Sequence, residues 1–116
     1  MGIMKIGIIV AMDKEFAQLQ KVFGNDPNVV LQKCGIGKVN AAIGATMMIE
    51  KHHPDVIISS GCAGGADPSL NVGDVVVAAE TTYHDAYCGQ EVAYGQIIGM
   101  PPRFKAPASL VEKALA

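Results

Sequence analysis

Hydrophobic residues fall into short apolar runs that alternate with amphipathic stretches. Residues 5–11, KIGIIVA, form a nearly continuous apolar run rich in β-branched residues, which is typical of a strand buried on both faces. Over residues 13–23 the spacing of Phe16, Leu19 and Phe23 predicts a helix with one apolar side. The same reasoning predicts further strands at residues 29–33, 55–60 and 75–80, and further helices at residues 38–52 and from 107 to 116.

Strands and helices therefore alternate in the first part of the chain. Because the strands are uniformly apolar, this order predicts an α/β fold with a mostly parallel, mixed sheet flanked by helices. The helix at 38–52 is expected to bury an apolar stripe, made of Val39, Ala42, Ile43, Met47 and Ile49. From Thr81 onward the pattern becomes irregular and aromatic.

Composition and charge narrow the class of protein. The chain has 116 residues, of which 50% are hydrophobic and 17% charged, and its net charge is −2, so we expect one globular domain. No basic cluster indicates a nucleic-acid partner, and no apolar run is long enough for a membrane span. The N-terminal apolar run is read as a core strand, not a secretory signal, because Asp13, Lys14 and Glu15 follow it directly.

The three cysteines, Cys34, Cys62 and Cys88, stand far apart in the sequence. Their odd number and the lack of a C-x-x-C pair argue against a disulfide framework or a structural zinc site. The chain is therefore expected to work in a reducing, cytoplasmic compartment.

Three loops follow the first three predicted strands and carry the candidate chemistry: AMDKE at 11–15, CGIGK at 34–38 and GCAGG at 61–65. The carboxyl ends of parallel strands share one edge of a sheet, where ligands bind in open α/β folds. Each glycine-rich loop alone is equally compatible with a tight turn. Neither the dinucleotide fingerprint nor the Walker pattern is present, so the three loops together indicate a different kind of ligand.

Five blocks in this order, KIGIIVAMDKE, CGIGKVNAAIGAT, PDVIISSGCAGG, VGDVVVA and YHDA…YGQ, resemble the N-terminal half of the 5′-methylthioadenosine/S-adenosylhomocysteine nucleosidases. That family belongs to the nucleoside phosphorylase group. The resemblance implies a phosphorylase/hydrolase-like fold of which residues 1–116 are the N-terminal part of a single domain. The chain departs from the family in two ways. Only GNDPN bridges a gap where the family has a further strand, and the chain ends about halfway through the family fold.

The resemblance also assigns roles to residues in the three loops. Glu15 matches the carboxylate that activates the attacking water, although an acidic residue is also common in the first turn of any helix. Five positions match the nucleoside-binding surface: Met12, Ile36, Cys62, Ala63 and Gly64. Core packing is the alternative reading for Met12 and Ile36. The substrate implied is a nucleoside thioether, with no metal and no cofactor.

The resemblance further implies a homodimer, with the segment that contains His84 and Asp85 at the interface.

Phosphorolysis is the first alternative reaction, but the chain has a single arginine, Arg103, and arginine is the usual bidentate partner of phosphate. A non-catalytic binding fragment is the second alternative. Because the family's second half supplies the acid that protonates the purine, these residues alone are expected to lose about 10²–10⁴-fold in rate.

Overall fold

The computed structural model describes residues 2–116, which divide into two compact units, one ending at Gly64 and the other running from Gly65 to Ala116. The first unit contains β1 (Ile6–Val10), α1 (Asp13–Phe23), β2 (Val29–Lys33), α2 (Lys38–His52) and β3 (Val56–Ser59). The second contains β4 (Glu80–Thr81), β5 (Phe104–Lys105) and α3 (Ala108–Leu115). No helix within residues 2–116 combines the length and apolar character that crossing a membrane requires.

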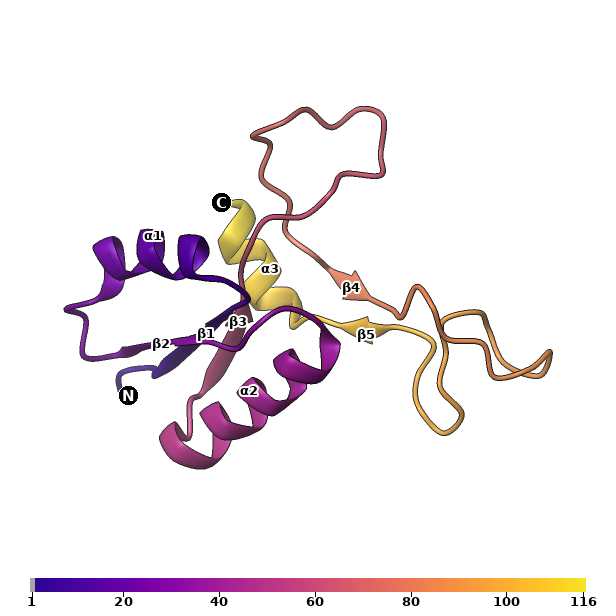
Figure 1. Cartoon of the computed structure of the whole chain (residues 1–116), viewed down its shortest axis with the longest axis horizontal. Coiled ribbons are helices and arrows are strands. Elements are labelled where there is room, and N and C mark those ends of the chain that lie inside the picture. Colours follow the sequence, from indigo (N-terminus) through magenta and orange to yellow (C-terminus); the bar gives the residue numbers. More distant parts are fainter. Residues whose placement is uncertain (1) are drawn as a thin grey trace. The chain divides into compact units, whose positions relative to one another are not determined.

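The first unit is a three-layer α/β arrangement built on a parallel sheet. The strand order is β2-β1-β3, with Ile6 opposite both Val29 and Val56. Helices α1 and α2 lie on opposite faces of this sheet (Figure 1). The predicted fold class is confirmed, and both of these helices and β2 have the predicted bounds.

The core of the first unit is small and centres on β1. Ile8, Ile9 and Val10 are buried there, and Met48 of α2 is completely buried. Gly7 makes room for that methionine, since a Cβ at Gly7 would lie only 2.8 Å from Met48 Sδ. Close approach of α2 to the sheet thus depends on a residue without a side chain.

The prediction that the apolar stripe of α2 is buried is wrong. The buried residues of the helix are Gly44 and Met48, whereas Val39, Ile43 and Met47 are 74%, 54% and 57% exposed. A helix can approach a sheet most closely through its smallest residue, so the face that contains Gly44 packs inward. Met48 lies on this same buried face, whereas Val39, Ile43 and Met47 lie on the accessible side of the helix.

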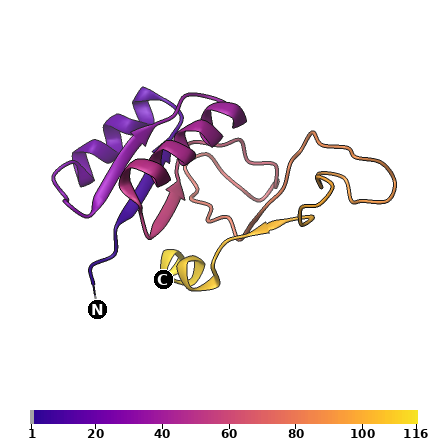
Figure 2. The same cartoon turned by 90° about the horizontal axis from the view of Figure 1, so that it is seen from below.

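The strand predicted at residues 75–80 is also wrong. Only Glu80 and Thr81 form a strand, which pairs antiparallel with Phe104 and Lys105. A strand requires a hydrogen-bonded neighbour, and residues 75–79 are in no strand pairing of the described part of the chain. Figures 1 and 2 show how irregular the course of the chain is between residues 65 and 104.

A few specific contacts connect distant residues of the irregular second unit. Thr82 Oγ1 donates to the carbonyl of Pro102 at 3.1 Å, which ties the two ends of the long loop between β4 and β5 together. Tyr83 packs edge-on against Phe104, and Tyr87 lies against Tyr94 with ring centres 6.4 Å apart. The predicted helix near the C-terminus is confirmed as α3.

Candidate active site

A cavity of about 370 Å³ lies where the three parallel strands of the first unit end. The ends of β1 and β3 and the loops that follow all three strands contribute to it, as expected for parallel strands that share one edge. Its lining residues are Ile9, Val10, Ala11, Glu15, Cys34, Gly35, Gly37, Ala41, Ser59, Ser60, Gly61, Cys62 and Ala63. The lining is mostly apolar or small, and Glu15 is its one charged side chain.

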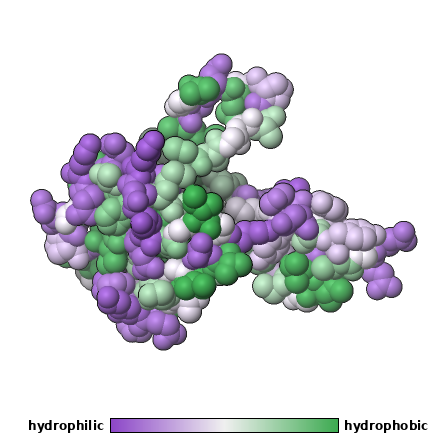
Figure 3. Space-filling model, viewed as in Figure 1, coloured by the Kyte–Doolittle hydropathy of each residue, from purple (hydrophilic) through white to green (hydrophobic). Residues whose placement is uncertain are grey.

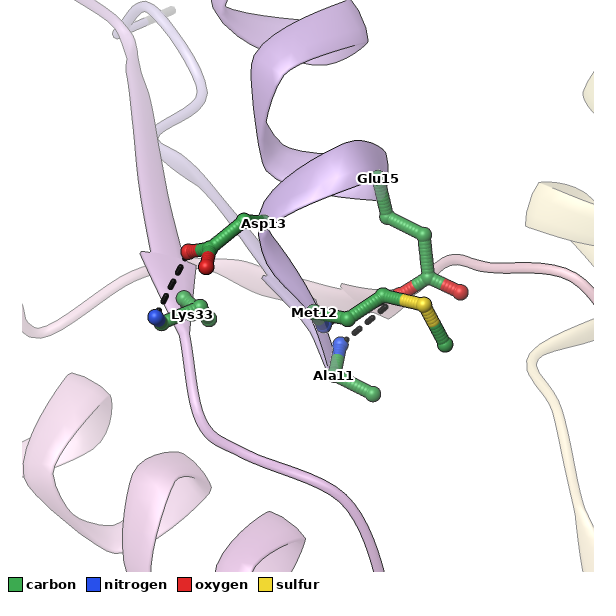
Figure 4. A network of polar contacts seen from close by, with 5 residues as sticks. All are labelled: Ala11, Met12, Asp13, Glu15 and Lys33. Carbon is green, nitrogen blue, oxygen red and sulfur yellow. Dashed lines mark hydrogen bonds and ion pairs between the residues drawn. The ribbon is translucent and has the colours of Figure 1, made fainter.

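Glu15 is held at this cavity by three backbone N–H groups. Ala11 and Met12 donate to Oε2 at 2.9 and 3.3 Å, and Cys62 donates to Oε1 at 3.0 Å. Two of these donors belong to the turn that leads into α1, and the third comes from the loop after β3. Figure 4 shows the carboxylate turned back toward Ala11 and Met12.

The hydrogen bonds also favour the charged form of this side chain. The N–H of Cys62 and then that of Ala11 hold the pKa of the Glu15 carboxyl below its usual range, because both donors stabilise the anion. Glu15 lies in the first turn of α1, where the positive end of the helix dipole favours the same form. Glu15 is therefore a carboxylate at neutral pH, able to accept a proton.

A second acidic residue of the same turn points elsewhere. Asp13 forms an exposed ion pair with Lys33 at the end of β2, with Oδ1 and Nζ 2.6 Å apart. Figure 4 shows the two carboxylates on opposite sides of the chain. The two acidic residues in the motif AMDKE thus have separate partners: Asp13 pairs with Lys33, and Glu15 faces the cavity.

The cavity contains two thiols, from Cys34 and Cys62. Cys62 is exposed, and Cys34 is half-buried. Desolvation by burial raises the pKa of the Cys34 thiol, so this side chain is neutral at physiological pH and acts as a small apolar group in the wall. No three His, Cys, Asp or Glu side chains within residues 2–116 come together as a metal site.

Sequence reasoning did not single out Gly61, whose lack of a side chain leaves room for the Glu15 carboxylate. A Cβ at this position would lie 2.6 Å from Glu15 Oε1, closer than real Cβ contacts allow. By contrast, a Cβ at Gly64 would meet no atom within 4 Å. The motif GCAGG contains three glycines, and nothing in the motif distinguishes Gly61 from the other two. The carboxylate that Gly61 faces belongs to Glu15, 46 positions earlier in the chain.

The structure brings together some of the predicted site residues. Glu15, Cys62 and Ala63 line the cavity, while the other three predicted contacts do not. Met12 is 39% exposed and Ile36 is 72% exposed. The roles of these residues toward a ligand remain predictions.

The family model described as the phosphorylase superfamily matches residues 17–116. The chain belongs to this superfamily. Among curated relatives, it is 43% identical to the 5′-methylthioadenosine/S-adenosylhomocysteine nucleosidase of Anoxybacillus flavithermus, with 96% of the chain and 56% of the relative covered. It is 44% identical to the nucleosidase of the same name from an Exiguobacterium species, with 93% and 54% covered.

A solved structure agrees with these relatives. The nucleosidase of Neisseria meningitidis, crystallised with methylthio-immucillin-A, superimposes with a TM-score of 0.90 at 33% identity and covers 97% of this chain and 57% of that one. The resemblance predicted from the five sequence blocks is therefore confirmed. The chain spans about half the length of the superfamily members that it matches.

Proposed function

We propose that this chain provides the water-activating part of an N-glycosyl hydrolase that cleaves 5′-methylthioadenosine and S-adenosylhomocysteine and releases adenine. The observation that carries the proposal is the Glu15 carboxylate, held ionised at the cavity by three N–H donors. A water molecule on the ribose face of the substrate would give its proton to this carboxylate as it attacks the sugar. The names of the similar proteins support this substrate class.

The remaining predicted contacts complete the proposed site. Cys62 and Ala63 would form the floor under the nucleoside, with Gly64 beyond them. Met12 and Ile36 would cover the ribose and the 5′-thioether, because a sulfur substituent is best accommodated by apolar, polarisable side chains.

Hydrolysis is favoured over phosphorolysis by the charge of the cavity. None of its lining residues is a lysine or arginine, and its charged group is the Glu15 anion. Arg103, the chain's single arginine, lies in the second unit with Nη1 3.6 Å from Oε2 of Glu80. Among these lining residues, phosphate would meet a repelling carboxylate and no bidentate cation.

The test is a chimera in which this chain replaces the matching part of the A. flavithermus nucleosidase. We expect it to release adenine from methylthioadenosine, and we expect Glu15→Gln to lower turnover about 10²-fold or more with nearly unchanged affinity for the substrate methylthioadenosine. Glutamine fills the same space but cannot accept the proton. Asp13→Asn is the matched control, because Asp13 faces Lys33 and should leave turnover unchanged.

Wild-type turnover in Glu15→Gln would overturn the assignment of this residue as the base. Turnover that requires phosphate would instead favour the phosphorolytic alternative. The isolated chain should release adenine at least about 10²-fold more slowly than the chimera, since the purine proton donor is not predicted among its residues.

We further propose that the protein forms a homodimer in the cytoplasm. Segment 83–100 supports the dimer, because Tyr87, Tyr94 and Ile98 are each about two-thirds exposed there. The three free thiols support a reducing compartment.

A further inference from the structure

The loop between β2 and α2, residues 34–37, forms one wall of the cavity. Gly35 and Gly37 line the cavity, and both have a backbone φ in the left-handed region, at 98° and 96°. Glycine enters this region without steric cost, but it leaves the region just as easily. The residues of the loop therefore do not fix its shape by themselves, and a contact from outside the loop is needed to hold this wall.

Asn40, in the first turn of α2, supplies such a contact. Its Nδ2 donates to the carbonyl of Ile36 at 2.8 Å. The same amide group lies against Gly35, where a Cβ would come within 3.1 Å of Nδ2. At its other end the loop is anchored by the N–H of Cys34, which donates to the carbonyl of Val10 at 2.8 Å. One side chain of α2 thus contacts two successive residues of the cavity wall.

Ile36 lies between the two glycines, and its side chain is exposed. Figure 3 shows hydrophobic residues at the surface over α2, the helix that follows this loop. Because both neighbours of Ile36 line the cavity, a rotation of the backbone at either glycine would move this side chain relative to a bound ligand. The hydrogen bond to its carbonyl therefore also determines where the side chain lies.

Glu15, the proposed base, is held by other loops. Its three N–H donors belong to Ala11, Met12 and Cys62. A change that loosens residues 34–37 would leave these three hydrogen bonds in place. A substitution at Asn40 should therefore affect ligand binding and not proton transfer.

We propose that Asn40 is a positioning residue of this site, which holds residues 34–37 as the wall for the ribose and the 5′-thioether. The inference rests on the proposed function, in which Ile36 covers that end of the substrate. With the hydrogen bond in place, the loop is ordered before the substrate arrives. Without it, binding must also order a loop that contains two glycines, and this loss of conformational entropy weakens the complex.

Asn40→Asp is the most specific variant. Aspartate has the shape of asparagine, but a carboxylate cannot donate to the Ile36 carbonyl. A negative charge in the first turn of a helix is favourable, so a merely structural role of residue 40 predicts a stable variant with normal binding. Asn40→Ala removes the donor without adding a charge, and alanine is the better helix former. The two variants should behave alike, because both lack the donor.

The matched control is Thr46→Val on the same helix. Thr46 Oγ1 donates to the carbonyl of Ala42 at 2.8 Å, which is also a bond from a side chain to the carbonyl four residues earlier. Backbone order parameters of the 116-residue chain are measured by NMR relaxation. They should fall at residues 35–37 in both Asn40 variants and stay at wild-type values in Thr46→Val.

The second readout is the affinity of the chimera for methylthioadenosine, measured by calorimetry in the Glu15→Gln background so that the substrate is not consumed. Both Asn40 variants should bind it about three- to tenfold more weakly, the usual contribution of one hydrogen bond. Adenine lacks the ribose and the thioether, so its affinity should not change. In the active chimera, KM should rise by about the same factor while kcat stays the same.

Several results would overturn this role of Asn40. Unchanged order parameters at residues 35–37 would show that Asn40 does not hold the loop. An equal loss of affinity for adenine and methylthioadenosine, or a lower kcat with an unchanged KM, would exclude the wall for the ribose and the thioether. Failure of the proposed function looks different, because the wild-type chimera would then release no adenine or would require phosphate. Calorimetry and NMR would still decide the role of Asn40 in that case.

Discussion

Gly61→Ala tests how the candidate base is held. The new Cβ would lie 2.6 Å from Glu15 Oε1, whereas ordinary contact begins at 3.4 Å. The carboxylate must therefore retreat by about 0.8 Å. The present bond from the Cys62 N–H to Oε1 is 3.0 Å long, so a retreat along the direction of this bond would extend it to about 3.8 Å, beyond hydrogen-bond range. We expect this bond to be lost.

The first readout is an NMR titration of the Glu15 side-chain carboxyl. The Cys62 N–H is the largest cause of the lowered pKa of Glu15, so the pKa should rise toward its ordinary value in the variant. In the chimera described above, a displacement of this size should lower turnover about 10²-fold, because the base would no longer be aligned with the water.

Unfolding measured against pH gives a second readout. A carboxyl whose pKa is lowered by folding stabilises the chain above its unfolded pKa, and this stabilisation is lost as the pH falls through the folded pKa. Gly61→Ala should therefore be less stable than wild type at neutral pH. The part of this difference that comes from Glu15 should disappear in acid, below both pKa values.

Gly64→Ala is the matched control, because its Cβ would meet no atom within 4 Å. It should leave the pKa of Glu15 and the stability at wild-type values. The reasoning fails if Gly61→Ala leaves the pKa of Glu15 unchanged, or if Gly64→Ala raises it by as much.

Two further predictions concern packing and assembly. Gly44→Ala should destabilise the chain by about 1–3 kcal/mol in urea unfolding, because the new Cβ would meet Cys34 Sγ. At an open helical position, the same substitution would stabilise the chain by up to about 1 kcal/mol, and such a result would contradict the close packing of α2. Replacing Tyr87 and Ile98 together by serine should convert the proposed dimer to a monomer in light scattering with unchanged helical content, and a dimer that persists would exclude segment 83–100 as its interface.

The sequence by itself determined most of the local structure of the first unit. α1, β2 and α2 begin and end where hydrophobic periodicity and turn residues predict. These signals are local, because a helix or a short apolar strand needs only its own side-chain pattern to be recognised. The parallel order also followed from the alternation of strands and helices, and with it the expectation that AMDKE, CGIGK and GCAGG meet at one edge.

Only the tertiary structure decided which partners each residue has. Residues 75–79 have the composition of a strand, but a strand forms only where another strand pairs with it. In this segment, pairing with β5 begins at Glu80. Gly44 and Met48 of α2 pack inward, whereas Val39, Ile43 and Met47 stay exposed, and only the three-dimensional packing decides this. Glu15 and Cys62 are 47 positions apart, and their hydrogen bond exists only because β1 and β3 are neighbours. Burial and pairing depend on what lies opposite a residue in space, and a single sequence does not contain that information.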